Sequence, residues 1–232
     1  MDESLTDQKM TFKAVIFDMD GTLIDSVNAD YSAWQKVFKD YHKSLTFQDY
    51  IPLLGIRSLG VVEEFLEPEN KEEQKRILAK KAGYFSEIVN ENGIELIPFA
   101  LDFVRHLKEN NIPLALATSS RRAKMEMVME KVGLISYFDV IVTAEDVANG
   151  KPSPDIFLKA AKALNVAPEN CVVFEDAENG IRAAKSAMMK CIGVNSNDTI
   201  DLLQEADLVI ESFKDLDFTT LCGQLKRVMV SE

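Results

Sequence analysis

The sequence predicts an α/β fold in which a doubly wound parallel sheet forms the core and a helical domain is inserted after the first strand. Two observations support this prediction. From residue 97 onward, short apolar segments of strand length alternate with segments of helical periodicity, the pattern of successive βαβ units. By contrast, residues 28–95 show helical periodicity and no strand-like run, so we expect them to form a separate helical unit.

The composition excludes several classes of protein. The chain has 232 residues, enough for a core domain with an insertion. Its net charge of -12 disfavours a nucleic-acid or anionic-membrane partner. No apolar run approaches the length of a membrane span, and residues 1–12 lack the apolar segment of a signal peptide. We therefore expect a cytoplasmic protein, a monomer or weak dimer, in which Cys171, Cys191 and Cys222 are reduced thiols.

The first strand is predicted at residues 14–17, four consecutive apolar residues. Because these residues do not alternate with polar ones, we expect a strand buried on both faces. Asp18 and Asp20 follow, and they point to the same side if the pleat continues. Gly21 then allows a sharp change of direction. Taken alone, this stretch is also compatible with a solvated turn.

The next elements are helical. Trp34, Val37, Phe38 and Tyr41 recur at the spacing of an amphipathic helix. A second helix is expected around residues 61–66 and a third at residues 71–91. The domain boundaries that follow are 28–95 for this helical cap and 1–27 with 96–232 for the core.

Strands and helices alternate in the rest of the chain. We expect helices at residues 100–110, 123–132, 154–164, 181–187, 200–206 and 216–228, and strands at residues 113–117, 140–142, 172–174, 191–194 and 208–210.

Polar residues follow three of the predicted strands: Asp18 and Asp20, Thr118 and Ser119, and Glu175 and Asp176. A parallel sheet places the carboxyl ends of its strands along one edge, where ligands bind. Lys151, in the loop after the strand at residues 140–142, is close enough in the chain to reach that edge. The sequence therefore predicts a site in which carboxylates, hydroxyls and one lysine converge.

This set of side chains points to a metal ion and a phosphate. Two ionised carboxylates in contact repel by about 4 kcal/mol at an effective dielectric constant of about 20. An oxygen-only set of ligands without His or Cys favours a hard cation, and Mg²⁺ is the usual one. Thr118, Lys151 and the backbone N–H groups of Ser119 and Ser120 supply donors for phosphate oxygens. One carboxylate can act as a nucleophile and another as a general acid/base.

These residues resemble the four motifs of the haloacid dehalogenase superfamily. The similarity comprises Asp18 to Ser26, Thr118, Lys151-Pro152 and Glu175-Asp176, in the order of the motifs. It implies a Rossmann-like core with a helical cap. It assigns Asp18 as nucleophile and Asp20 as general acid/base, with Thr118 and Lys151 holding the transferring phosphoryl group. The metal ligands implied are Asp18, the Asp20 carbonyl, Asp176 and Glu175, the last directly or through water.

The same resemblance distinguishes activities within the superfamily. A carboxylate at Asp20 is absent from true dehalogenases, so the chain resembles the phosphotransferases, and in particular sugar-phosphate phosphatases and β-phosphoglucomutases. The mutases carry a histidine in the hinge to the cap, where this chain has Asp30. Arg57 and Lys81 (or Lys80) are the cap residues expected to contact substrate. Arg57 lies one position early for the arginine of the mutases.

We therefore predict a Mg²⁺-dependent phosphatase that acts on a small phosphorylated metabolite, most simply a sugar phosphate. A β-phosphoglucomutase is the first alternative. A catalytically silent regulator on the same fold is the second, and it is disfavoured because every motif residue is present.

Overall fold

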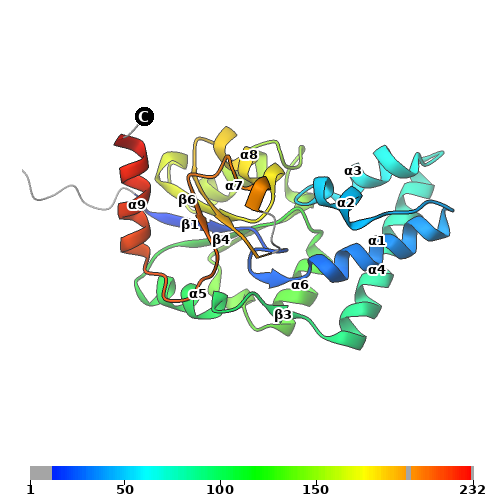
Figure 1. Ribbon diagram of the computed structural model, residues 1–232, viewed down its shortest axis with the longest axis horizontal. Coiled ribbons are helices and arrows are strands. Elements are labelled where there is room, and N and C mark those ends of the chain that lie inside the picture. The colour runs from blue at the N-terminus through cyan, green and yellow to red at the C-terminus, as the bar shows by residue number, and fades with distance from the viewer. Residues whose placement is uncertain (1–11, 197–199, 231–232) are drawn as a thin grey trace, which may run out of the picture.

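The computed structural model describes residues 12–196 and 200–230. Its centre is a parallel six-stranded sheet in the order β5-β4-β1-β6-β7-β8 (Figure 1). The strands are β1 (Ala14–Phe17), β4 (Leu114–Ala117), β5 (Val140–Val142), β6 (Cys171–Glu175), β7 (Lys190–Val194) and β8 (Leu208–Ile210). From β1 the chain adds strands first on one side and then on the other. The doubly wound sheet is therefore confirmed, with β1 at the point where the strand order reverses.

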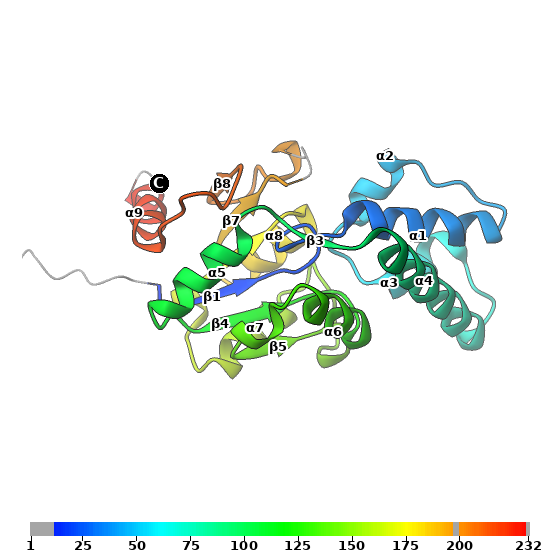
Figure 2. The same cartoon turned by 90° about the horizontal axis from the view of Figure 1, so that it is seen from below.

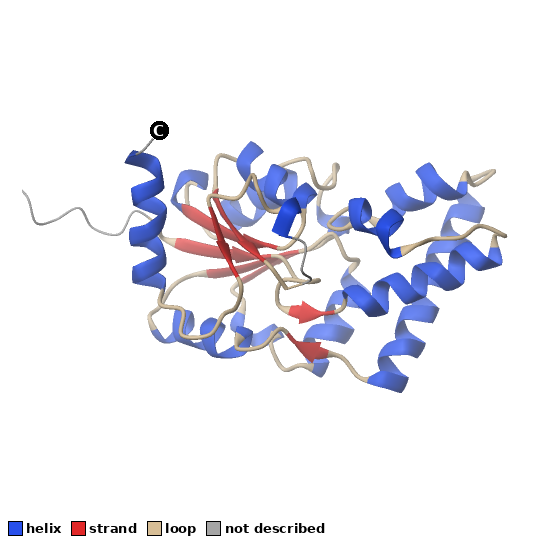
Figure 3. Ribbon diagram, viewed as in Figure 1, coloured by secondary structure: helices blue, strands red, loops and turns tan. Residues whose placement is uncertain are grey.

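The central strand is buried on both faces because its alternate residues enter two different cores. Val15 and Phe17 belong to the apolar cluster that includes α5 (Ala100–Glu109), α6 (Arg122–Lys131) and the buried part of α9 (Phe218–Val230). Ala14 and Ile16 belong to the cluster formed with α7 (Asp155–Ala163) and α8 (Glu178–Ser186). Figure 3 shows helices on both sides of the sheet. This two-sided burial explains the absence of polar alternation in the strand.

The inserted helices lie together beyond the end of the sheet (Figures 1 and 2). They are α1 (Val27–Asp40), α2 (Phe47–Tyr50), α3 (Ser58–Val61), a π-helical segment (Val62–Leu66) and α4 (Lys71–Asn92). Trp34, Val37 and Phe38 of α1 form their own apolar core with Val62 and Ile77. Side chains also define the helix starts: the Asn70 carboxamide accepts hydrogen bonds from two backbone N–H groups of the first turn of α4.

The cap and the sheet are joined by a short antiparallel pair of strands that the sequence pattern does not predict. β2 (Ile24–Asp25) precedes α1 and β3 (Glu95–Leu96) follows α4. Ile24 pairs with Leu96, and Asp25 with Glu95. Strands of two residues are too short to show a period, so their pairing depends on the return of the chain from the helices.

One expected helix is shorter than predicted. Residues 200–206 form only a single 3₁₀ turn, Ile200–Leu202, before the chain bends into β8. Leu203 is fully buried, and its side chain lies where a Cβ on Gly193 of β7 would be 3.2 Å away. Packing of this leucine directly on the sheet replaces the expected helical continuation. The polar leader expected at residues 1–11 lies outside the described residues.

None of the helices in the described part of the chain is long and apolar enough to cross a membrane. Cys171 and Cys191, on the neighbouring strands β6 and β7, are buried thiols, as the sequence predicts.

Phe174 of β6 tests the larger apolar core. Its ring lies 4.9 Å from that of Phe17 and 5.4 Å from that of Phe103. We expect Phe174→Ala to lower the free energy of unfolding by about 3–5 kcal/mol, because it removes a buried ring and leaves a cavity. Urea unfolding measures the effect. Leu158→Ala, at a side chain 38% exposed on α7, is the control, with an expected change below about 1 kcal/mol; equal losses in both variants would contradict this packing.

Candidate active site

The three strand ends predicted to converge do so. Asp18 follows β1, Thr118 follows β4, and Glu175 with Asp176 ends β6. The register aligns these ends, since Phe17 pairs with Leu116 on one side and Phe174 on the other. These four polar side chains are all buried. Burial of so many polar groups at one sheet edge requires that they satisfy one another or a ligand.

Lys151 lies at the centre of this group. Its Nζ is 2.5 Å from Asp18 Oδ1 and 2.5 Å from Glu175 Oε1, and its side chain is fully buried. Burial alone would lower the pKa of Lys151, but the two carboxylates raise it above its usual value. The ammonium therefore stays charged and joins the ends of β1 and β6.

Three acids surround this single lysine. Asp18, Glu175 and Asp176 each place a carboxylate oxygen within 4.8 Å of those of the other two. Burial, reinforced by the neighbouring acids, raises the pKa of Asp18 to about 7 although Lys151 opposes the shift. The pKa of Asp176 is also raised well above its usual value, by burial first and then by Glu175 and Asp18. Both carboxyl groups therefore hold their protons more tightly than free acids, and when all three acids are ionised their charge exceeds what Lys151 alone neutralises.

The donor set fits a divalent cation. The three acids of the cluster offer carboxylate oxygens, which hard cations prefer. Within the cluster, Glu175 already accepts hydrogen bonds from Lys151 and from the backbone N–H groups of Asp176 and Ala177. Its carboxylate is therefore oriented by the protein, and a bound cation would compensate Asp18 and Asp176.

The turn after Asp20 closes over Asp176. The Thr22 hydroxyl donates a hydrogen bond to Asp176 Oδ1 at 3.1 Å. Gly21 has a φ of +81°, and a Cβ at this position would lie 2.0 Å from Asp176 Oδ2. Only glycine satisfies both the backbone conformation and this close approach.

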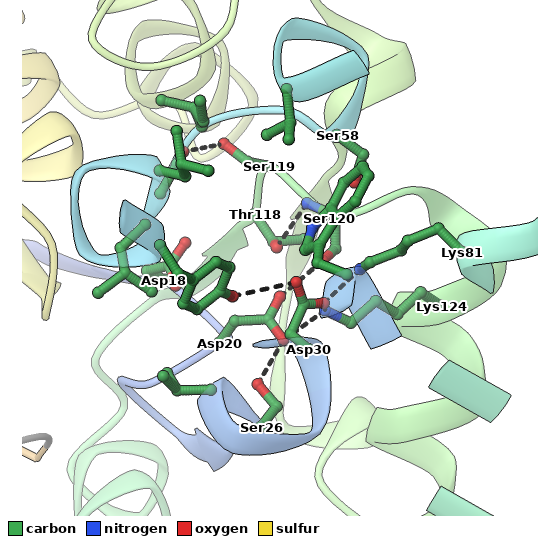
Figure 4. Close-up of a pocket in the computed structure, with 18 residues that line it drawn as sticks. Asp18, Asp20, Ser26, Asp30, Ser58, Lys81, Thr118, Ser119, Ser120 and Lys124 are labelled. Atoms are coloured by element: carbon green, nitrogen blue, oxygen red, sulfur yellow. Dashed lines mark hydrogen bonds and ion pairs between the residues drawn. The ribbon is translucent and has the colours of Figure 1, made fainter. Parts of the chain in front are cut away.

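Asp20 has a different environment from Asp18. Its carboxylate is not part of the three-acid cluster. It accepts hydrogen bonds from the hydroxyls of Ser26 and Ser120, both at 2.5 Å, and lies 2.8 Å from the Nζ of Lys124 (Figure 4). Of the four carboxylates expected to crowd together, three do so. The fourth, the carboxylate of Asp20, is held away from the cluster by the hydrogen-bond donors described above.

The cap contributes a second charged group to the site. Asp30 of α1 forms ion pairs with Lys81 of α4 and, at 2.8 Å, with Lys124 of α6 (Figure 4). The Tyr50 hydroxyl donates to its other oxygen at 3.1 Å. Burial alone would raise the pKa of Asp30, but Lys124 and Lys81 hold it well below its usual value. Lys81, expected from the sequence to face substrate, thus reaches the site while paired with Asp30.

A cavity of about 60 Å³ lies between Asp18 at the sheet edge and Asp30 of the helical insertion. Its polar lining includes Asp18, Asp20, Asp30, Lys81, Thr118 and Lys124, and its apolar lining comes from cap residues such as Trp34, Leu54 and Ile56. The cavity therefore lies at the junction of the sheet edge and the helical insertion.

The side chains of two residues expected at the substrate, Arg57 and Ser119, make contacts with backbone carbonyls. Arg57 is not among the residues lining the cavity; its guanidinium donates to the carbonyls of Val147 and Ala148, both at 2.9 Å. Ser119 does line it, but its hydroxyl donates to the Gly55 carbonyl at 2.6 Å. Both side chains fasten the cap loop to the core. Glycine at 150 makes room for this contact, because a Cβ there would lie 2.8 Å from the Arg57 side chain.

Sequence reasoning missed three contributions to the site: the hydroxyl of Ser120, which was expected only as a backbone donor, and the side chains of Lys124 and Tyr50. A signal was present for the first two, because both closely follow the strand end at Thr118, Ser120 in the loop and Lys124 in the first turn of α6. Tyr50 carries no such signal, since its contact with Asp30 depends on how α2 packs on α1.

Comparison with known proteins agrees with this geometry. The family model for haloacid dehalogenase-like hydrolases matches residues 15–194. A phosphorylated carbohydrates phosphatase of Thermotoga maritima is 38% identical over 180 residues, 75% of this chain and 81% of that protein. A β-phosphoglucomutase of Bacillus subtilis is 33% identical over 227 residues, 95% and 98% of the two chains. The crystal structure of a β-phosphoglucomutase from Clostridium difficile superposes with a TM-score of 0.84 at 31% identity, covering 94% of this chain and 99% of that one.

The raised pKa of Asp18 predicts a pH-dependent response to Mg²⁺. A carboxyl group whose pKa rises from 3.8 to about 7 on folding binds its proton more tightly in the folded state. Its contribution to stability is therefore lost as the pH rises through that range. In EDTA we expect the free energy of unfolding to fall between about pH 5 and about pH 8. Saturating Mg²⁺ should restore more stability at the higher pH, where no proton has to be displaced.

Urea unfolding at the two pH values, with EDTA or Mg²⁺, measures this effect. Asp18→Asn should flatten the dependence, and Asp102→Asn, at an exposed acid of α5, should leave it unchanged. A stabilisation by Mg²⁺ that is equal at both pH values, or absent, would contradict the assignment of the cluster as a cation site.

Proposed function

Because this chain belongs to the haloacid dehalogenase-like hydrolases, we propose that it is a phosphatase that hydrolyses a small phosphorylated metabolite, a sugar phosphate in the simplest case. The observation that carries this proposal is the different setting of the two aspartates. Asp18 lies against Lys151 in the acidic cluster, and Asp20 lies apart among hydroxyl donors and Lys124. In this proposal Asp18 is the carboxylate that attacks phosphorus, and Asp20 is the one that transfers the proton.

In the proposed first step, an Asp18 oxygen attacks phosphorus and the bond from phosphorus to the ester oxygen breaks. Asp20 gives its proton to that leaving oxygen. In the second step, Asp20 removes a proton from water, the water oxygen attacks phosphorus, and the bond to Asp18 breaks to release phosphate. Thr118 and Lys151 hold the phosphoryl oxygens through both steps. A bound divalent cation supplies neutralisation of the negative charge on the acids and the phosphoryl group.

The cap residues of the cavity support hydrolysis over the mutase alternative. Where the mutases that the sequence resembles carry a hinge histidine, Asp30 is already paired with Lys81, Lys124 and the Tyr50 hydroxyl. An acid held in this way offers no counterpart to an imidazole. The relatives include both activities, so the product of the reaction is what separates them.

Several finer expectations belong to this proposal. They are Mg²⁺ as the cation, residues 28–95 as a cap that covers the site, a cytoplasmic location, and a monomer or weak dimer. A silent regulator on the same fold is disfavoured, because the acids, the lysine and the threonine of the site are all in place.

Replacing the nucleophile tests the proposed chemistry. We expect Asp18→Asn to lower kcat at least about 10³-fold, because an amide cannot form the phosphoryl intermediate. Phosphate release from a panel of sugar phosphates measures the effect, with circular dichroism to show that the fold is retained. Asp102→Asn is the matched control. Substantial Mg²⁺-dependent turnover by the Asp18 variant would sink the proposal.

The two activities are separated by product analysis. With β-glucose 1-phosphate and glucose 1,6-bisphosphate as activator, a phosphatase releases inorganic phosphate, and a mutase forms glucose 6-phosphate. We expect phosphate release. Net conversion to glucose 6-phosphate, with little free phosphate, would replace our proposal by the mutase.

A further inference from the structure

Lys124 is a half-buried lysine with no role in the proposed reaction. It lies in α6, on the sheet domain, and its side chain is 16% exposed. Its Nζ is 2.8 Å from Asp20 Oδ1 and 2.8 Å from Asp30 Oδ1, and it lies 4.4 Å from the centre of the Phe85 ring. The lysine therefore contacts one carboxylate after β1 and another on cap helix α1, beside an aromatic ring of α4.

Lys124 is the central link in a row of alternating charges. The row runs from Asp20 to Lys124, then to Asp30 and finally to Lys81 (Figure 4). The first two members belong to the sheet domain, and the last two to cap helices α1 and α4. Each member is buried enough that loss of a neighbour leaves a poorly compensated charge. The position of the Lys124 ammonium is consequently set from both sides of the junction.

The other two hydrogen-bond donors to Asp20 do not link its carboxylate to the cap. Ser26 and Ser120, whose hydroxyls donate to its two oxygens, both belong to the sheet domain. Lys124 is the donor that links the Asp20 carboxylate to a residue of the cap.

We propose that Lys124 is a positioning residue for Asp20: paired with Asp30 of the cap, it fixes the orientation in which the Asp20 carboxyl group reaches the leaving oxygen. The inference rests on the proposed function, in which Asp20 is the general acid. It predicts that proton transfer to the leaving group is efficient only while Asp30 holds Lys124. A lysine that simply bound the phosphoryl group would act on every substrate alike.

Substrates with different leaving groups separate these two roles. The p-nitrophenolate ion leaves without being protonated, whereas the alkoxide of a sugar needs a proton from the general acid. The value of kcat/KM reports the steps up to release of that group. We expect Lys124→Met to lower kcat/KM about 100-fold for a sugar phosphate turned over by the wild type. For p-nitrophenyl phosphate the expected loss is about threefold or less.

Two further variants complete the experiment. Lys124→Arg should restore part of the lost activity on the sugar phosphate, since a guanidinium can also pair with two carboxylates. Lys131→Met, at an exposed lysine of the same helix, is the matched control and should leave both substrates unaffected. If Lys124→Met does not fold, as judged by thermal denaturation, Asp30→Asn provides the same test, because it removes the cap partner of Lys124.

Equal losses on the two substrates would overturn the inference while leaving the phosphatase proposal intact. So would additive effects of Lys124→Met and Asp30→Asn in the double variant, because residues that act as one unit show non-additive losses. Absence of wild-type turnover on either substrate would overturn the proposed function, and this inference with it.

Discussion

The site depends on one buried lysine that holds two strand ends together. Lys151 joins the carboxylates of Asp18 and Glu175, at the carboxyl ends of neighbouring strands. Removing these charges from water carries a large desolvation penalty, which the pairing offsets only when the geometry is fixed. The parallel sheet provides that geometry, because the register of β1 with β6 aligns the two acids. When ionised, the three acids carry more negative charge than Lys151 neutralises, and this is what makes the cluster suited to a cation.

A second set of charges lies across the boundary between sheet and cap. Asp20, Lys124, Asp30 and Lys81 alternate in sign across that boundary, while Arg57 and Ser119 fasten the cap loop to the core. The cap is therefore held by polar contacts next to the cavity, in addition to the paired strands of its hinge. Several of the side chains that line the cavity therefore also hold the cap in place.

The sequence predicts the part of the site that the sheet arranges. Asp18, Thr118, Glu175 and Asp176 each end a buried apolar run, and parallel strands bring such ends together whatever the loops do. Lys151 was within reach of the same edge. The helical insertion was also predictable, because its amphipathic periods extend over many residues. The two-residue strands of the hinge were not, since no period fits so short a segment.

The part of the site that helix packing arranges was not predicted. The contact of Lys124 with Asp30 depends on how α6 and α1 are rotated toward each other across the domain junction. Arg57 was expected at the substrate from its loop, but the fold places it on the carbonyls of Val147 and Ala148. The helix expected at residues 200–206 is also shorter than predicted. Tertiary packing is again the reason, because Leu203 packs on the sheet.

The central claim is that Asp18 carries the phosphoryl group during turnover. Quenching the reaction with sodium borohydride during steady-state turnover of a sugar phosphate tests it directly, because borohydride reduces an acyl phosphate to an alcohol. Mass spectrometry of the proteolytic peptide that contains residues 14–18 then reports the outcome. We predict conversion of Asp18 to homoserine, and only when substrate is present. An unmodified Asp18 during active turnover, or reduction at another acid, would contradict the account.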